Sequence, residues 1–102
     1  MNIVQVKNGK VELRKDSGSL IRTITVPDVA VNASINAEQT LILITTAKGK
    51  VELRKDSGSL IRTITVPDVA VNAVFSGKDI LITTSKGKSE LRKESGSLIR
   101  RF

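Results

Sequence analysis

The stretch GKVELRKDSGSLIRTITVPDVAVNA occupies residues 9–33 and occurs again, without a single change, at residues 49–73. A third copy, GKSELRKESGSLIRRF, is drifted and shorter and occupies residues 87–102. Repetition at a spacing of about 40 residues is typical of a chain that uses one supersecondary unit several times. Such a unit cannot bury its apolar faces alone, so neighbouring copies must cover one another. The repeat predicts how the chain is built, and it does not identify a binding partner.

Each copy divides into short segments of β-favouring residues separated by turn signals, and no segment has a helical period. In the central copy these segments are residues 29–35, 40–47, 51–54 and 60–65. Asn8-Gly9 predicts a tight type I′ hairpin, because both residues tolerate positive φ. Val26-Pro27-Asp28 cannot continue a strand ladder, since proline has no N–H to donate, so we expect it to connect successive units.

The alternation of side chains predicts which faces of the strands are covered. In the segment 29–35 it places one set of residues on one face (Val29, Val31, Ala33 and Ile35) and the remainder on the other (Ala30, Asn32 and Ser34). The segment 40–47 is continuously apolar before two threonines, as expected of a strand that is covered on both faces. Val51-Glu52-Leu53-Arg54 predicts one apolar and one charged face, and we interpret carboxylates such as Glu12 and Asp16 as solvated.

These features predict an all-β fold of propeller blades, each made of four antiparallel strands. The chain would hold two full blades, at residues 26–65 and 66–102, and three strands of another at residues 1–25, all within a single domain of residues 1–102. The structural alternative is a β-solenoid or amyloid-like stack, with LILITT at residues 41–46 as a zipper segment. An in-register stack would place Arg14 on Arg54, and such like-charge contacts favour the propeller.

The stretch VNAVFSGKDILITTSKGKSELRKESGSLIRRF, residues 71–102, resembles the strand pattern of WD-repeat propellers. The resemblance covers nearly the whole chain, but the Trp-Asp and Gly-His signatures of that family are absent. Arg14 and Lys15 stand where Trp-Asp would be, so the hydrogen-bonded His, Asp and Trp network of the family cannot form here. The resemblance implies a propeller that acts as a structural or binding scaffold.

The chain is too short for a complete propeller, which usually has roughly four to eight blades. An open wedge of blades would leave aliphatic side chains facing water at both ends. We therefore expect the protein to be its own partner and to close the ring by homo-oligomerisation, as a dimer in preference to a trimer. The contact between chains would be heterologous, head to tail, and has to close to avoid filaments.

The formal net charge of +7 suggests a candidate binding surface. If the chain is a propeller, the turns within the repeats and the connections between them emerge on one face, which collects the residues Asn8, Lys10, Lys48, Lys50, Lys86 and Lys88 together with Asp28 and Asp68. A ring of lysines could bind nucleic acid, another polyanion or an acidic peptide. The alternative is a set of solubilising loops, since Lys-Gly is favourable in hairpins. The near absence of aromatic residues argues against base stacking on single strands.

Other functional classes lack the residues that they need. Without His or Cys, no Ser-His or Cys-His nucleophile and no thiolate metal site can form, so we predict that the protein is not an enzyme and uses no cofactor. The sequence shows no basic leader followed by an apolar stretch. Its longest aliphatic run, Leu41–Ile44, is too short to span a bilayer. We expect a cytoplasmic protein with no membrane partner.

Overall fold

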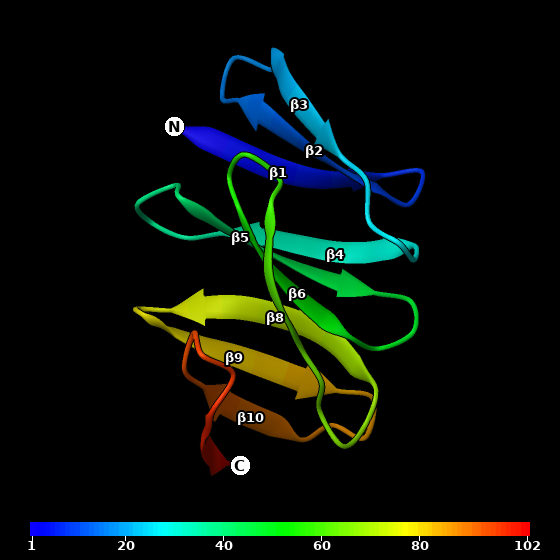
Figure 1. The fold of residues 1–102 in the computed structure, drawn as a ribbon, viewed down its shortest axis with the longest axis vertical. Coiled ribbons are helices and arrows are strands. Elements are labelled where there is room, and N and C mark those ends of the chain that lie inside the picture. The colour runs from blue at the N-terminus through cyan, green and yellow to red at the C-terminus, as the bar shows by residue number, and fades with distance from the viewer.

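The computed structural model describes all residues, 1–102, and the chain forms eleven β-strands (Figure 1). They are β1 (Asn2–Lys7), β2 (Lys10–Lys15), β3 (Leu20–Ile24), β4 (Ala30–Ile35), β5 (Leu41–Thr46), β6 (Val51–Lys55), β7 (Leu60–Ile64), β8 (Ala70–Ser76), β9 (Asp79–Thr84), β10 (Ser89–Arg92) and β11 (Leu98–Arg101). The structure has no helix of the length and apolar character that crossing a membrane requires.

The strands form three antiparallel sheets, in which each strand pairs with its neighbour in the sequence. Sheet 1 is β1-β2-β3, sheet 2 is β4-β5-β6-β7 and sheet 3 is β8-β9-β10-β11. The sheets follow one another along the longest axis of the molecule (Figure 1). β1 pairs with β2 in the same register as β5 pairs with β6, so β1 is the equivalent of β5. Sheet 1 therefore lacks a strand equivalent to β4 and β8.

Two apolar clusters fill the joints between the sheets. The joint between sheets 1 and 2 contains Val11, Leu13, Ile24, Val26, Ala30, Ile42 and Ile44. The joint between sheets 2 and 3 contains Leu43, Val51, Leu53, Ile64, Val66, Ala70, Ala73, Ile80 and Ile82. Residues of β5 alternate between the two joints, so this strand is covered on both faces, as its continuous apolar run predicts.

The alternation predicted for residues 29–35 is wrong in its first half. Ala30 is only 2% exposed, whereas Val29 and Val31 are 53% and 50% exposed. The pairing of β4 with β5 shifts register between Ala30 and Asn32. Such a bulge leaves one residue unpaired and changes the phase of the alternation. Beyond it, Ala33 and Ile35 pack against the cluster between sheets 1 and 2.

The turns after β1 and β5 differ by one residue, and the difference has a structural reason. Asn8 and Gly9 have φ of 53° and 77°, as predicted for a tight type I′ hairpin. The turn after β5 is Ala47-Lys48-Gly49, closed by the Gly49 N–H, which donates to the Thr46 carbonyl at 2.9 Å. The Ala47 N–H donates to the Val29 carbonyl at 2.8 Å, so the longer turn binds the connection that leads into β4.

Gly49→Ala should destabilise the fold more than Gly87→Ala, although both glycines have positive φ, 84° and 78°. A Cβ at position 49 would lie 2.5 Å from Val69 Cγ1 and 2.8 Å from Val69 Cα, whereas one at position 87 would meet nothing within 4 Å. We expect a loss of about 1 kcal/mol for Gly87→Ala from backbone strain. For Gly49→Ala we expect about 2 kcal/mol more from overpacking. Urea unfolding measures both, and equal losses would contradict the close approach to Val69.

Candidate functional site

The residues of the predicted binding surface are all exposed and lie in or beside three hairpin turns: Asn8 and Lys10, Lys48 and Lys50, and Lys86 and Lys88. We call these turns the lysine rim. They lie at the same end of the sheets as the connections β3–β4 and β7–β8, on the right in Figure 1. Hydrogen bonds join turns to connections, because Ala30 N–H donates to the Gly9 carbonyl at 2.9 Å and Ala70 N–H donates to the Gly49 carbonyl at 3.0 Å.

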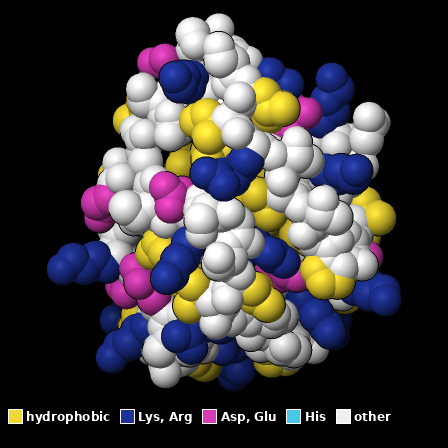
Figure 2. All heavy atoms as spheres, turned by 45° about the horizontal axis from the view of Figure 1, so that its top comes forward, with side chains coloured by type: hydrophobic (Ala, Val, Ile, Leu, Met, Phe, Trp, Pro, Cys, Tyr) yellow, Lys and Arg dark blue, Asp and Glu magenta, His cyan; other side chains and the backbone are white.

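Acidic side chains from the connections reach into the lysine rim. The Asp28 carboxylate accepts a hydrogen bond from the Lys48 backbone N–H at 2.9 Å. Asp68 forms an ion pair with Lys86 Nζ at 3.3 Å. Figure 2 shows Lys and Arg side chains scattered over the visible face, with Asp and Glu side chains among them. The basic charge of the rim is therefore partly compensated locally.

Hydrogen bonding to the Asp28 carboxylate lowers its pKa below the ordinary value of 3.8. The largest cause is the backbone N–H of Val29, and the backbone N–H of Lys48 adds to it. Donors aimed at an ionised carboxylate favour its charged form. The charged Asp28 side chain thus fixes the turn of sheet 2 against the connection that enters the same sheet.

This lowered pKa predicts a loss of stability in acid. A carboxyl with a depressed folded-state pKa contributes stability above its unfolded pKa, and that contribution is lost as the pH falls through the folded pKa. We expect Asp28→Asn to flatten the decline of the melting temperature below the ordinary pKa of 3.8. Glu38→Gln is the control, because Glu38 is exposed and forms no ion pair. Thermal unfolding followed at several pH values measures the effect, and parallel curves for Asp28→Asn and the unchanged protein would contradict it.

Two equivalent hollows lie beside the lysine rim. One, of about 220 Å³, is lined by Pro27, Asp28, Thr46, Lys48, Lys50, Glu52 and Thr63. The other, of about 230 Å³, is lined by Pro67, Asp68, Thr84, Lys88, Ser89, Glu90 and Arg101. Both are polar, and each contains carboxylates as well as cationic side chains. The main difference is that Arg101 stands where the first hollow has Thr63.

Each hollow is lined by a carboxylate that belongs to a buried ion pair, Glu52 in one and Glu90 in the other. In sheet 2, Arg54 Nε donates to Glu52 Oε1 at 2.8 Å, and Arg54 Nη1 donates to the Gly58 carbonyl at 2.7 Å. Glu52 is 6% exposed and Arg54 is 8% exposed. We call this arrangement the Glu-Arg-Gly bridge. It joins the third strand of the blade pattern to the turn that follows, and it recurs in the other sheets with Glu12, Arg14 and Gly18, and with Glu90, Arg92 and Gly96.

The interpretation of these charges as a solvated face is wrong for sheets 2 and 3. Arg54 lines a hollow with Thr23 and Ile24 of β3, so this face of sheet 2 is turned toward sheet 1. The sequence does contain a signal for the bridge. Each copy has Glu and Arg two residues apart on a strand, with a turn glycine four residues after the arginine. That spacing lets one guanidinium reach both the carboxylate and the glycine carbonyl.

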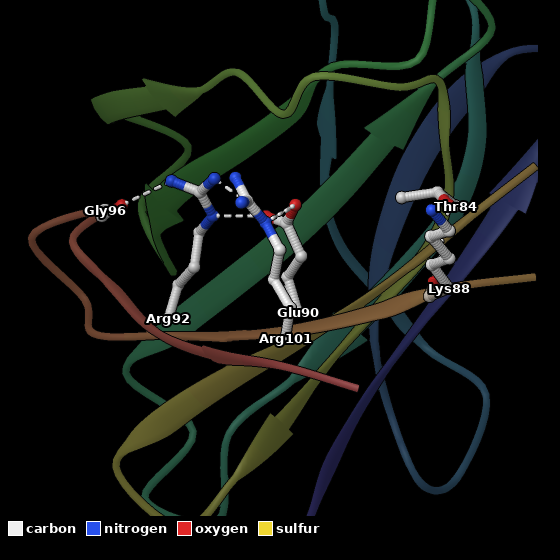
Figure 3. Close-up of polar contacts among 6 residues, drawn as sticks. All are labelled: Thr84, Lys88, Glu90, Arg92, Gly96 and Arg101. Carbon is white, nitrogen blue, oxygen red and sulfur yellow. Dashed lines mark hydrogen bonds and ion pairs between the residues drawn. The ribbon is translucent and has the colours of Figure 1, made fainter. Parts of the chain in front are cut away.

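Sheet 3 adds a second arginine to the bridge (Figure 3). Arg92 Nη2 donates to Glu90 Oε1 at 2.7 Å, and Arg101 Nε donates to Glu90 Oε2 at 3.2 Å. Figure 3 shows Arg92 between Glu90 and the Gly96 carbonyl, with Thr84 and Lys88 farther away. Glu90 is 4% exposed and has cationic donors on both oxygens. This carboxylate is therefore committed to the fold and is not free for a ligand.

No protein-family model and no curated protein matches the sequence. Solved structures do match. BamB from Moraxella catarrhalis is 18% identical, with a TM-score of 0.78 over 98% of this chain and 32% of that chain. The WD40 β-propeller domain of Doa1 is 16% identical, with a TM-score of 0.80 over 99% of this chain and 36% of that one. BBS1N, solved in complex with ARL6DN, is 14% identical, with a TM-score of 0.82 over 99% of this chain and 34% of that one.

These identities establish the fold alone, and the chain spans about a third of each propeller that it matches. The all-β propeller fold and the resemblance to WD-repeat propellers are confirmed at that level, and the solenoid alternative is excluded by the three separate antiparallel sheets. The chain therefore has the fold of consecutive β-propeller blades, and a Glu-Arg-Gly bridge recurs in each of its three sheets.

Proposed function

We propose that this chain closes a propeller ring with further copies of itself and that the ring is a scaffold for binding other proteins. Residues 1–25, 26–65 and 66–102 would be the three blades of one chain. Since each chain supplies three sheets, two chains would give six blades and three chains nine, and we favour six. The binding role is inferred by analogy with propeller domains such as BBS1N, which was solved with a partner protein.

The observation that carries this proposal is the exposure of equivalent residues at the two ends of the chain. At the start, Ile3 is 44% exposed, whereas Ile42 and Ile80, which hold the same place in sheets 2 and 3, are fully buried. At the other end, Phe102 is 67% exposed, whereas the equivalent Ile64 is 3% exposed. Each end face is thus half of a joint whose other half lies at the opposite end of another copy.

Both end faces also carry a polar residue that the internal joints lack. Gln5 pairs with Glu12 as Ile44 pairs with Glu52, so glutamine replaces a buried isoleucine at the first face. Ser89 replaces the buried Val51 at the last face, since Phe102 N–H donates to the Ser89 carbonyl where Ile64 pairs with Val51. In a head-to-tail contact these two polar side chains would enter the same joint and distinguish it from the internal ones. That contact is heterologous and closes as a ring.

Sedimentation velocity and native mass spectrometry test the ring over a wide range of concentrations. We expect one discrete species, a dimer or a trimer. A monomer that persists at high concentration would overturn the proposal and would identify Gln5 and Ser89 as solubilising residues of terminal repeats. A continuous ladder of oligomers would equally overturn it, because an open filament does not close.

Leu91→Asp should disperse the assembly without unfolding the chain. Leu91 is half-buried at the last end face, where the equivalent Leu53 is 1% exposed within a joint. An unpaired carboxylate at the contact is expected to weaken association by at least about a hundredfold. Leu98→Asp is the matched control, because Leu98 is 40% exposed on the outermost strand and lies outside the apolar joints. If Leu91→Asp and Leu98→Asp associate equally well, this face is not the contact.

The lysine rim is a second candidate function, as a site for nucleic acid, another polyanion or an acidic peptide. All its lysines are exposed at one end of the sheets, which supports this function. Carboxylates of Asp28 and Asp68 within the rim oppose it. Binding to heparin or duplex DNA that survives physiological salt would support the rim as a binding site. Retention that vanishes at that salt concentration would indicate surface charge alone.

Two further expectations accompany the scaffold proposal. The absence of catalytic activity and the cytoplasmic location stay predictions from the sequence. They are tested by activity screening and by localising the tagged protein.

A further inference from the structure

The inner edge of β1 lacks the strand that the same edge has in the other two sheets. In sheet 2, Ala33 of β4 pairs with Ile44 of β5, and in sheet 3, Ala73 of β8 pairs with Ile82 of β9. β1 pairs with β2 alone. The N–H and C=O groups along the inner side of Ile3–Lys7 are therefore without strand partners, and such an edge is a template for pairing with another segment.

The neighbouring strand β4 forms a wall beside this edge, as β8 does beside β5. In sheet 2 this position is occupied by β4, and the equivalent wall is β8. Two side chains of β4 form hydrogen bonds with β8. Asn32 Nδ2 donates to Asn72 Oδ1 at 2.5 Å, and Ser34 Oγ donates to the Ala73 carbonyl at 3.0 Å. By the repeat, a strand beside β1 would meet the side chain of Asn32 and the carbonyl of Ala33.

Two alanines that are preceded by the same sequence differ in exposure. Ala33 and Ala73 are the last residues of the two unchanged copies. Ala73 is 2% exposed, whereas Ala33 is only half-buried. Ser34 of β4 donates to the Ala73 carbonyl and β4 packs against β8 there, whereas no strand of this chain holds the equivalent place beside Ala33.

We propose that the inner edge of β1 and the facing side of β4 form a binding site for an extended peptide segment with the chemistry of the inner strands. The ligand is a β-strand of small residues with one asparagine followed by alanine and a hydroxyl residue, as in VPDVAVNASI, the sequence of Val26–Ile35. It adds a fourth strand to sheet 1 by β-augmentation. The site lies between β1 and β4 of one chain, so it does not depend on ring closure.

The far end of the site sets the length of the ligand. The Asn2 backbone N–H is already bound, because Gln39 Oε1 accepts it at 2.9 Å. In sheet 2 the equivalent Leu41 N–H is bound by Asn36 of the inner strand's own hairpin, at 3.0 Å. The ligand strand therefore ends opposite Ile3, at the position that Ile35 holds opposite Ile42.

The outermost strands are poorer templates than β1. Their exposed edges carry Arg22, Arg62 and Arg100, and charged side chains on an edge discourage pairing. They also have no facing asparagine. A peptide with the inner-strand sequence should thus select β1 among the free edges.

The test uses a synthetic VPDVAVNASI peptide with a fluorescent label and the isotope-labelled full chain. We expect saturable one-to-one binding by fluorescence anisotropy, with slowed amide exchange at Val4 and Val6, whose N–H groups face the inner edge, and shifts of the β4 resonances. A peptide with proline in place of its serine is the control, because the equivalent Ser34 lies at a ladder position and proline there cannot donate. Absence of binding, or shifts confined to β3, β7 or β11, would overturn the proposal.

A matched pair of chain variants tests the role of Asn32. Asn32→Ala removes the contact to the peptide, the hydrogen bond to Asn72 and the one from the Ala33 N–H, whereas Asn72→Ala removes only the hydrogen bond between the two asparagines. We expect about tenfold weaker peptide binding by Asn32→Ala and unchanged binding by Asn72→Ala. Equal peptide affinities of Asn32→Ala and Asn72→Ala would show that Asn32 of β4 does not contact the asparagine of the peptide. That result would overturn the proposed sequence preference. Oligomeric state, measured in parallel, separates this result from that of ring closure.

Discussion

Leu53→Ala should lower the free energy of unfolding by about 3 kcal/mol, because it removes buried methyl groups and leaves a cavity. Leu53 is 1% exposed and lies at the centre of the joint between sheets 2 and 3, together with Val51, Ile80 and Ile82. For a domain of this length, that loss corresponds to a fall of roughly 15 °C in melting temperature. Urea unfolding and calorimetry of the variant measure the two quantities.

Equivalent leucines in the other copies are the controls for Leu53→Ala. Leu13 is 2% exposed in the joint between sheets 1 and 2, so Leu13→Ala should cost nearly as much. Leu91 is only half-buried at the last end face, so in a monomer Leu91→Ala should cost less than about 1 kcal/mol. A loss for Leu91→Ala that matches that of Leu53→Ala would mean that another chain covers Leu91 under the conditions of the measurement.

Arg54→Ala should destabilise the fold by about 3 kcal/mol through a different mechanism. The substitution leaves the Glu52 carboxylate buried without its cation, and breaking one side of a buried ion pair is costly for that reason. It also removes the hydrogen bond from Arg54 to the Gly58 carbonyl, which closes the following turn. Chemical denaturation at neutral pH measures the loss.

Arg14→Ala is the matched control for Arg54→Ala, because the first Glu-Arg-Gly bridge has no sheet on its outer side. The Arg14 and Glu12 side chains are 25% and 14% exposed, against 10% and 8% for Arg54 and Glu52. Water can solvate Glu12 after the substitution, so we expect a loss of about 1 kcal/mol. Similar losses for Arg14→Ala and Arg54→Ala would show that both bridges are equally enclosed, which a closed ring would produce.

Most of the fold could be predicted from the sequence because local signals agree with the long-range pattern. Asn8-Gly9 specifies its own backbone geometry, and the apolar run of Leu41–Ile44 specifies a strand between two layers. The bulge after Ala30 could not be predicted, because a run of small and β-branched residues fits either phase of the alternation. Only the pairing of β4 with β5 fixes that phase.

The candidate site was less accessible from the sequence. The topology predicts that Lys48 and Lys86 share one face with Asp28 and Asp68. The individual contacts, Asp28 with the Lys48 N–H and Asp68 with Lys86 Nζ, depend on how the connections fold back over the turns. The buried position of Glu52 was missed because alternating charges on a strand normally indicate a wet face. A buried carboxylate needs a guanidinium positioned to form an ion pair with it. The alternation of charged and apolar residues in one strand does not show that the arginine is positioned in this way.

The two internal joints contain largely equivalent residues of the repeated sequence. Residues 9–48 therefore correspond to one repeat unit that could be added to the chain or removed from it. Recombination between the identical stretches would lengthen or shorten the gene by one such unit. Each new joint between sheets would then contain the same residue contacts as an existing joint. In the proposed ring, the number of blades could therefore change by one at a time without a new kind of contact between blades.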